Sequence, residues 1–333
     1  MIRIGVIGYG YWGPNIVRNF MGHSDCEVAM ICDRDTNTLA RAHRLYPGVK
    51  TCSESNEMLS SPDIDAVAVI TPVSTHFEFA REALENGKHV FVEKPFTLTS
   101  DEAKRLIDLA AKKKLQIMVD HTFLFTGAVG KIKQLVEQDS LGRLYYYDST
   151  RVNLGLFQHD VNVVWDLAPH DLSIMDHLIP GEPEALVATG QRHFNGLENV
   201  AYITIYYPHS VIAHFNVNWL SPVKVRTTLI GGEKRMLVWN DLEPDEKIKL
   251  YDKGVDVQTR GEVYDLLVSY RTGDMLAPKI EQIEALKAET RYFLDCIQKG
   301  ESPHNDGEAG LRVVQLLEAA DESIHCRGCL VEL

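Results

Sequence analysis

The feature that most constrains this chain is a glycine-rich turn directly after its first apolar segment. Residues 2–7 form a short apolar run, and GYGYWG follows at residues 8–13 before a helix-like stretch. Glycines at this spacing permit a tight turn, close approach of the backbone to a pyrophosphate and close packing of the helix on the strand. Asp33 follows about twenty residues later, where a carboxylate can bind an adenosine ribose. The pattern predicts a dinucleotide site; the alternative is a glycine-rich turn that only closes a strand–helix unit.

The residues after the second apolar run bear on the form of the dinucleotide. The Asp33 carboxylate favours a free ribose 2′-hydroxyl, because it would repel the additional phosphate of NADP. Arg34 stands beside it and could accept that phosphate, stack on the adenine or lie in solvent. We therefore expect NAD, with NADP as the alternative.

Length, charge and composition narrow the class of protein. The chain has 333 residues, enough for two domains, and its formal net charge of −13 disfavours a nucleic-acid or anionic membrane surface. No apolar run is long enough to span a bilayer and Met1 leads directly into a strand, so we expect a cytoplasmic protein without a signal peptide. The six cysteines are scattered, as is usual in a reducing compartment. Cys326 and Cys329 have redox spacing, but we interpret them as bystanders.

Strands and helices alternate through the first third of the chain. We expect helices at residues 36–45, 56–60, 74–86 and 100–113, and strands at residues 2–7, 27–32, 51–53, 65–70, 89–92 and 115–119. Ser100 is the expected cap of its helix. Such alternation predicts an α/β fold with a doubly wound parallel sheet. Because ligands of these sheets bind beyond the carboxyl ends of the strands, residues 71–72, 93–95 and 120–121 should face one crevice.

The alternation of strands and helices ends near residue 121. We expect a helix at residues 127–138, a strand at 143–152, a loop and then a helix over 157–179, hairpins from 183 to about 252, and helices at 280–299 and 308–325. Residues 211–219 alternate, with His214, Asn216 and Asn218 on one face, which predicts an antiparallel sheet with one packed and one polar or interfacial face. The chain is therefore expected to have a dinucleotide domain at residues 1–121 and a substrate-binding and oligomerisation domain at residues 122–333, with the last helices packing back toward the first domain.

Lys94 is the first candidate for chemistry. It follows a strand, between Glu93 and Pro95, and the Lys–Pro bond could be cis. An ammonium group at this place can stabilise negative charge that develops on a reacting oxygen. The alternative is a surface lysine paired with Glu93.

Asp166 and His170 are the second candidates, four residues apart on one face of an expected helix. Because Pro169 is tolerated best in a first turn, Asp166 is a plausible N-cap. The acid could instead keep His170 basic near neutral pH for proton transfer. The pair could also bind a metal with His121 or His177, but the chain has no recognised metal motif and we expect no metal.

With these motifs in place, the chain resembles the Gfo/Idh/MocA oxidoreductases, the relatives of glucose–fructose oxidoreductase and inositol dehydrogenase. The resemblance rests on residues 8–13, 71–76, 87–95, 166–170 and 289–320 and spans nearly the whole chain. It implies an N-terminal Rossmann domain and a C-terminal α+β domain with a large, mostly antiparallel open sheet. In the family this sheet commonly pairs subunits, which implies a dimer or tetramer here. The face with His214, Asn216 and Asn218 would then border a subunit interface.

The resemblance also implies the catalytic set Lys94, Asp166 and His170. Many relatives carry an Asn-Arg pair after the strand that here ends at Asp120, so their substrate specificity does not transfer. Residues 151–155 and 160–165 resemble a branch linked to nucleotide sugars and amino sugars.

Together these patterns predict NAD(P)-dependent hydride transfer between a nicotinamide and a secondary alcohol or ketone of a sugar, nucleotide sugar or cyclitol. The positions expected to contact the cofactor are Gly8, Gly10, Tyr11, Trp12, Gly13, Asp33, Arg34, Thr71, Pro72, His76, Glu93, Lys94 and His121. The positions expected to contact the substrate are Lys94, Arg151, Asn153, Asn162, Trp165, Asp166 and His170. Two alternatives are a glycosidase or lyase that recycles NAD through a transient ketone, and a non-catalytic NAD sensor.

Overall fold

The computed structural model describes residues 1–155, 158–194, 196–259 and 266–333. The chain divides into two units, the first formed by Met1–Phe125 and Ile283–Gln315 and the second by Thr126–Gln282 and Leu316–Leu333. The first division falls close to the predicted boundary after residue 121. Residues 283–315, in the region of the last two expected helices, belong to the first unit. The loop expected from Phe157 begins at a residue outside the described part of the chain.

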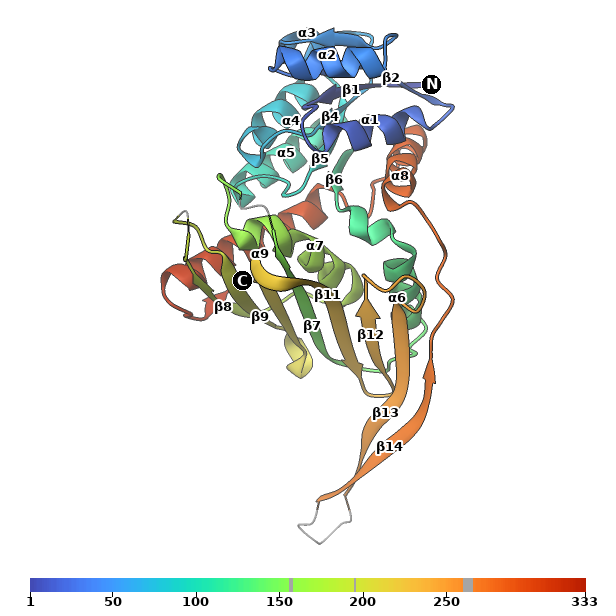
Figure 1. The fold of residues 1–333 in the computed structure, drawn as a ribbon, viewed down its shortest axis with the longest axis vertical. Helices are drawn as coiled ribbons and strands as arrows, with labels where there is room; N and C mark the ends of the chain where they lie inside the picture. Colours follow the sequence, from blue (N-terminus) through green and yellow to red (C-terminus); the bar gives the residue numbers. More distant parts are fainter. Residues whose placement is uncertain (156–157, 195, 260–265) are drawn as a thin grey trace. The chain divides into compact units, whose positions relative to one another are not determined.

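The first unit is built on a six-stranded parallel sheet, as predicted for a doubly wound fold (Figure 1). Its strands are β1 (Ile2–Ile7), β2 (Cys26–Cys32), β3 (Lys50–Cys52), β4 (Ala66–Val69), β5 (His89–Glu93) and β6 (Ile117–Asp120). Their order in the sheet is β3-β2-β1-β4-β5-β6. The order reverses between β1 and β4, and it is at such a reversal that doubly wound sheets bind their ligands.

Helices cover this sheet and supply its core. They are α1 (Gly13–Met21), α2 (Thr36–Leu45), α3 (Ser55–Leu59), α4 (His76–Glu85), α5 (Ser100–Lys113) and α8 (Ala285–Lys299), with short 3₁₀ turns η1 (Val73–Thr75) and η2 (Thr122–Phe125). Two expected ends were wrong. The cap of α5 is Thr99, whose hydroxyl accepts the Glu102 N–H, and α8 begins at Ala285 rather than at residue 280.

Residues 283–315 join the first unit because α8 completes its apolar core. The rings of Phe20 on α1, Phe91 on β5 and Phe293 on α8 pack edge to face, with centroids 5.6 to 6.3 Å apart. All three side chains are fully buried. Edge-to-face packing of this kind stabilises a core beyond the burial of the ring area.

The second unit is built on a nine-stranded sheet in the order β14-β13-β12-β11-β7-β10-β9-β8-β15. Its strands are β7 (Leu144–Leu154), β8 (Ala185–Gln191), β9 (Val200–Tyr206), β10 (Ile212–Asn218), β11 (Leu220–Gly232), β12 (Met236–Asn240), β13 (Ile248–Thr259), β14 (Leu266–Leu276) and β15 (Val331–Glu332). The predicted mostly antiparallel sheet is confirmed. One detail differs, because β10 pairs with β9 antiparallel but with β7 parallel. Alternation along a strand reports which face is buried and not the direction of its neighbours.

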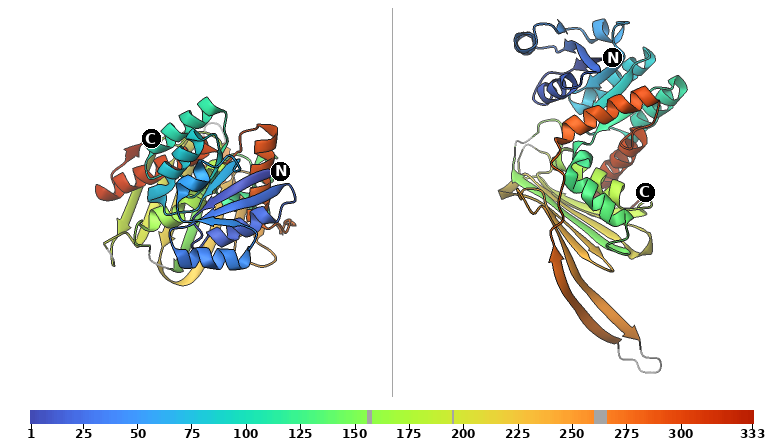
Figure 2. Two further views of the ribbon diagram at one scale, coloured as in Figure 1. Left: turned by 90° about the horizontal axis from the view of Figure 1, so that it is seen from above. Right: turned by 90° about the vertical axis from the view of Figure 1, so that its right-hand side faces the viewer.

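One face of this large sheet carries the helices of the second unit, as the right-hand view of Figure 2 shows for α6 and α7. The helices are α6 (Gly127–Glu137), α7 (Val163–Leu178) and α9 (Gly307–His325), with the short 3₁₀ turn η3 (Pro208–Ser210). The division between the units falls within α9, after Gln315. On β10, Ala213, Phe215 and Val217 are buried, whereas His214, Asn216 and Asn218 are partly exposed, as the alternation predicted. No helix in the described part of the chain is long and apolar enough to cross a membrane.

Candidate functional site

The glycine turn has the geometry that a pyrophosphate requires. Gly8 has a φ of +95°, and a Cβ at Gly8 would lie 2.2 Å from the Ile70 carbonyl oxygen. A Cβ at Gly13 would lie 2.3 Å from the Gly8 carbonyl oxygen, so neither position tolerates a side chain. At Gly10, in contrast, no heavy atom of the described residues lies within 4 Å of the Cβ position. The backbone at Gly10 is therefore open to a phosphate, next to the N-terminus of α1.

Asp33 is held at the end of β2 in an orientation that suits a ribose. Its Oδ2 accepts the Tyr9 N–H at 2.7 Å and its Oδ1 accepts the Asp35 N–H at 2.9 Å. Each oxygen keeps a further lone pair for a ligand hydroxyl. A pocket of about 610 Å³ opens here, lined by residues that include Gly8, Gly10, Asp33, Arg34, Glu54, Thr71, Pro72 and Phe79. Six of these eight residues are predicted cofactor contacts, and the structure brings them together around one cavity.

His76 links the two loops that follow β4 and β5. Its side chain is 1% exposed, and its ring nitrogens lie 2.8 Å from the Thr71 carbonyl oxygen and 2.9 Å from the Pro95 carbonyl oxygen. Burial lowers the pKa of His76. The Lys94–Pro95 peptide bond is cis, as the sequence allowed. His76 therefore ties the loop that contains Thr71 to the turn at Lys94 and Pro95.

The remaining predicted cofactor residues lie at the carboxyl ends of β5 and β6 and in the glycine turn. Glu93 and Lys94 are half-buried, and Glu93 is in register with Asp120 on β6. His121, the next residue, is buried. Trp12 approaches the same edge, since its Nε1 donates a hydrogen bond to Asp120 Oδ2 at 2.9 Å. Tyr11 lies in the same turn, but its side chain differs from the others in being 91% exposed.

Helix α7 of the second unit carries the predicted acid–histidine pair. The expectation that Asp166 caps this helix was wrong. The cap is Asn162, whose side-chain oxygen accepts the N–H groups of Val164 and Trp165 at 3.0 and 3.2 Å. Pro169 therefore lies inside the helix, at the cost of one backbone hydrogen bond, and is buried in the core.

The helical conformation places Asp166 and His170 one turn apart on the same face of α7. Both side chains are partly exposed, as a group that meets a ligand must be. Asp166 Oδ2 accepts a hydrogen bond from Nε1 of Trp219 at 3.0 Å. Trp219, between β10 and β11, is itself buried, so it fixes the orientation of the carboxylate.

The predicted substrate contact Arg151 is bound to a protein partner. Its Nε and one terminal nitrogen donate to the two carboxylate oxygens of Asp171 at 2.7 and 2.9 Å. Arg151 is 5% and Asp171 3% exposed, so this bidentate ion pair ties β7 to α7 inside the protein.

Asn162 and Trp165 are likewise bound to α9. The Asn162 amide nitrogen donates to Asp321 Oδ1 at 2.9 Å and to Glu198 at 3.2 Å, and Trp165 Nε1 donates to Asp321 Oδ2 at 2.7 Å. Burial raises the pKa of Asp321. Asn153, near the end of β7, is partly exposed. Contact of these side chains with a substrate remains a prediction.

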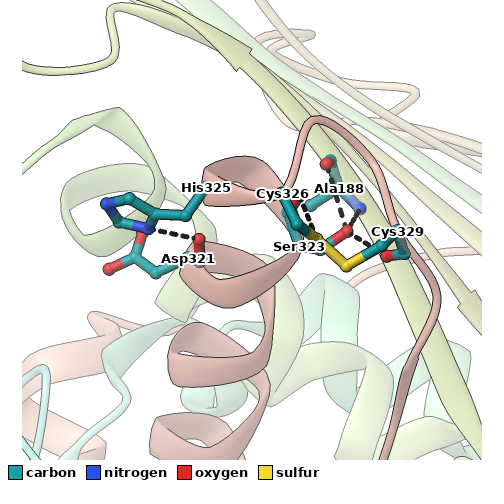
Figure 3. Close-up of a disulfide and its surroundings, with 6 residues drawn as sticks. All are labelled: Ala188, Asp321, Ser323, His325, Cys326 and Cys329. Atoms are coloured by element: carbon teal, nitrogen blue, oxygen red, sulfur yellow. Dashed lines mark hydrogen bonds between the residues drawn. A yellow bond between two sulfur atoms is a disulfide. The ribbon is translucent and has the colours of Figure 1, made fainter.

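Cys326 and Cys329, interpreted above as bystanders, form a disulfide at the end of α9 (Figure 3). Arg327 and Gly328 between them have φ values of +62° and +93°, and this tight turn brings the two Cα atoms to 5.7 Å. The Ser323 hydroxyl donates to the Cys329 carbonyl oxygen at 2.6 Å. No group of three or more His, Cys, Asp or Glu side chains in the described residues could hold a metal ion.

Comparison with known proteins assigns the family. Residues 2–121 match the model of the oxidoreductase family with an NAD-binding Rossmann fold, and residues 129–238 match the model of the GFO/IDH/MocA C-terminal domain. The chain belongs to the Gfo/Idh/MocA family. The resemblance stated from the motifs is thereby confirmed, and the protein is an NAD-binding oxidoreductase.

Full-length relatives in the Gfo/Idh/MocA family act on several compounds. UDP-N-acetylglucosamine 3-dehydrogenase of Acidithiobacillus ferrooxidans is 27% identical over 94% of each chain. The NADP(+)-dependent scyllo-inositol 2-dehydrogenase of Bacillus subtilis is 24% identical over 97% of this chain and 93% of its own. A levoglucosan dehydrogenase in complex with NADH and levoglucosan has a TM-score of 0.84, with 21% identity over 99% of both chains. Because the two chains are only 21% identical, this structural similarity shows a shared fold and does not show a shared substrate.

Sequence reasoning missed the partners that hold the site residues. Asp171, Trp219 and Asp321 orient Arg151, Asp166 and Asn162, but they come from other elements of the second unit. No local motif marks them. Only the tertiary structure shows that Arg151, Asp166 and Asn162 are hydrogen-bonded to these side chains.

Proposed function

We propose that this protein oxidises a secondary alcohol of a sugar, nucleotide sugar or cyclitol with NAD, or reduces the corresponding ketone. The observation that carries the proposal is the Asp166–His170 pair on one face of α7, with Asp166 held by Trp219, in a chain of an NAD-binding oxidoreductase family. The substrate class is taken from the relatives, which oxidise compounds of this kind.

The proposed chemistry assigns one role to each of three side chains. An imidazole nitrogen of His170 takes the hydroxyl proton of the substrate as general base. The Lys94 ammonium group stabilises the alkoxide that develops on the same oxygen. Asp166, itself oriented by Trp219, orients the imidazole of His170 or holds the neighbouring hydroxyl of the substrate. When bound, the nicotinamide supplies the acceptor for the hydride that leaves the carbon.

The proposed form of the cofactor is NAD. Asp33 and Glu54 both line the pocket at the end of β2, whereas Arg34 is the basic residue there. Two carboxylates disfavour the doubly charged 2′-phosphate of NADP, and the fixed Asp33 oxygens suit two ribose hydroxyls. The relatives do not settle the question, because one is named for NADP(+) and another is bound to NADH.

The geometry leads us to revise the roles proposed for the substrate contacts. We assign Arg151, Asn162 and Trp165 to fixing α7, because their polar atoms are bonded to Asp171 and Asp321. The residues proposed to contact the substrate are then Asn153, Lys94, Asp166 and His170.

The test is NADH absorbance with purified protein, NAD or NADP, and a panel of sugars, cyclitols and nucleotide sugars. We expect NAD reduction with one class and a kcat/KM for NAD at least tenfold above that for NADP, about 1.4 kcal/mol of discrimination. If no compound of the panel gave NADH although the protein binds NAD, the proposal would be contradicted. Cleavage of a glycoside without net NADH would instead indicate a cofactor-recycling enzyme.

A further inference from the structure

A buried pair of carboxyl groups lies behind the cofactor turn of the first unit. Glu289 on α8 is 0% exposed and Asp120 at the end of β6 is 2% exposed. The Thr122 hydroxyl lies within hydrogen-bonding distance of both acids, at 2.8 Å from Glu289 Oε2 and in a short contact with Asp120 Oδ1. The proposed reaction uses neither acid.

If both acids were ionised, two carboxylate oxygens would face the single hydroxyl proton of Thr122. The hydrogen bonds of this cluster therefore require one further proton, carried by one of the two acids. The other Glu289 oxygen accepts the Asn305 amide at 3.2 Å, and the other Asp120 oxygen accepts Trp12 Nε1 at 2.9 Å. Thr122 has a single hydroxyl proton, which it can donate to only one of the two acids. If Thr122 donates to Asp120, then Glu289 carries the further proton and donates it to the Thr122 oxygen or to the neighbouring Asp120 carboxylate, with which it also has a side-chain hydrogen bond.

We propose that Glu289 is a neutral carboxylic acid that positions the cofactor turn through the chain Glu289–Thr122–Asp120–Trp12. Trp12 is the cap residue of α1 and belongs to the turn that is open to a phosphate at Gly10. The inference rests on NAD binding by this family and is independent of the substrate proposed above.

Burial and neighbouring charge both keep the proton on Glu289. The largest cause is desolvation, followed by the nearby Asp120 and, more weakly, Glu93 at the end of β5; together they raise the pKa of Glu289 well above its ordinary value. Arg18 on α1 pairs with Glu284 at the start of α8, and His23, which follows α1, contacts the hydroxyl of Thr290 beside Glu289. The two ionisable groups that raise the pKa of Glu289 in this way, Asp120 and Glu93, are both acidic.

The proposal gives NAD affinity a definite pH dependence. While Glu289 is protonated, the chain to Trp12 is complete. As the pH rises through the raised pKa of Glu289, two carboxylates face one hydroxyl proton and the cluster loses its order. For the free energy of unfolding, the contribution of the protonated Glu289 is therefore fully present below about pH 4.5, the ordinary pKa of a glutamate. This contribution is lost as the pH rises through the raised pKa of Glu289 in the folded protein.

The experiment measures NADH affinity by fluorescence, without substrate, from mildly acidic to alkaline pH for the wild type, Glu289→Gln and Glu289→Ala. Glutamine keeps one donor and one acceptor in the same places, so E289Q should bind NADH as tightly as the wild type at low pH. We expect the affinity of the wild type to fall roughly tenfold at alkaline pH relative to E289Q, and E289A to bind weakly throughout. The matched control is Glu308→Gln, which makes the same change at an exposed glutamate on α9 within the first unit.

Three results would overturn the inference. They are an alkaline loss of affinity in E289Q equal to that of the wild type, wild-type affinity in E289A, or no NADH binding by the wild-type protein. The E289Q comparison remains decisive if E289A does not fold. Because no sugar is present, failure to oxidise the substrate panel would contradict the proposed reaction and leave this inference intact.

Discussion

The functional side chains differ in how the surrounding residues hold them. Asp33 is oriented by two backbone amides and Asp166 by the indole of Trp219, so both carboxylates are fixed before any ligand binds. Lys94 is half-buried at the end of β5, next to the loop that His76 holds. Fixed acids and a positioned ammonium group suit a reaction in which charge develops on one oxygen.

Lys94→Met tests the residue that is proposed to stabilise this charge. We expect kcat to fall roughly 10²–10³-fold, the usual effect of removing one stabilising donor from a developing oxyanion, while NADH affinity stays within about twofold of the wild type. Steady-state kinetics and NADH titration measure the two quantities. Lys104→Met, at an exposed position on α5, is the control and should change neither. Near-wild-type turnover in K94M would remove Lys94 from the mechanism.

Local motifs in the sequence identified the candidate site residues, but they did not identify the side chains that surround and bind them. Gly8, Gly10 and Gly13 could be identified because their roles depend on the turn itself. The substrate contact of Arg151 stays a prediction, and the sequence did not show that Arg151 forms an ion pair with Asp171 inside the protein.

Among the elements, α7 connects sequence to function most directly. It carries Asp166 and His170, and Asn162 at its start both caps it and bonds to Asp321 on α9. Its capping residue was misassigned because Pro169 normally marks a first turn. Burial of Pro169 and its apolar neighbours against the sheet allows the helix to continue through it.

Asn162→Ala should separate stability from catalysis at this element. Loss of the cap and of the bond to Asp321 is expected to lower the free energy of unfolding by about 1–2 kcal/mol. Because α7 carries the proposed catalytic pair Asp166 and His170, kcat should also fall severalfold. Thr99→Ala, which removes the side-chain cap of α5, should lower stability comparably and leave kcat unchanged. Equal activity in the two variants, measured alongside urea unfolding, would contradict the role given to Asn162.

On the scale of the whole molecule, the large sheet of the second unit has one face covered by helices and one with exposed apolar side chains. Tyr202, Tyr206, Ile212 and Leu229 are 37 to 45% exposed, and the cross-strand pairs of β9 with β10 place Tyr202 and Tyr206 beside Asn216 and Ile212. An exposed apolar surface on a sheet is typical of an interface. It supports the proposal, made from the family resemblance, that two copies pair through this sheet.

Sedimentation velocity tests the proposed pairing. We expect a dimer or larger assembly for the wild type and a shift towards monomer for the double variant Tyr202→Glu/Ile212→Glu, because charges introduced at the centre of an apolar interface are costly to desolvate. Leu45→Glu, at an exposed position on α2 of the first unit, is the matched control and should leave the assembly unchanged. A wild-type monomer, or a double variant that assembles like the wild type, would contradict the prediction.

The sequence by itself determined the doubly wound sheet, the cofactor turn and the spacing of Asp166 and His170, because each depends on residues close together in the chain. Apolar runs, glycines and helical spacing act over a few residues, so their consequences are local. Only the tertiary structure decided that α8 completes the first core and that Cys326 pairs with Cys329. It alone also joined Glu289, Thr122 and Asp120. Burial and proton sharing are properties of the folded environment, which brings together side chains that no local pattern relates.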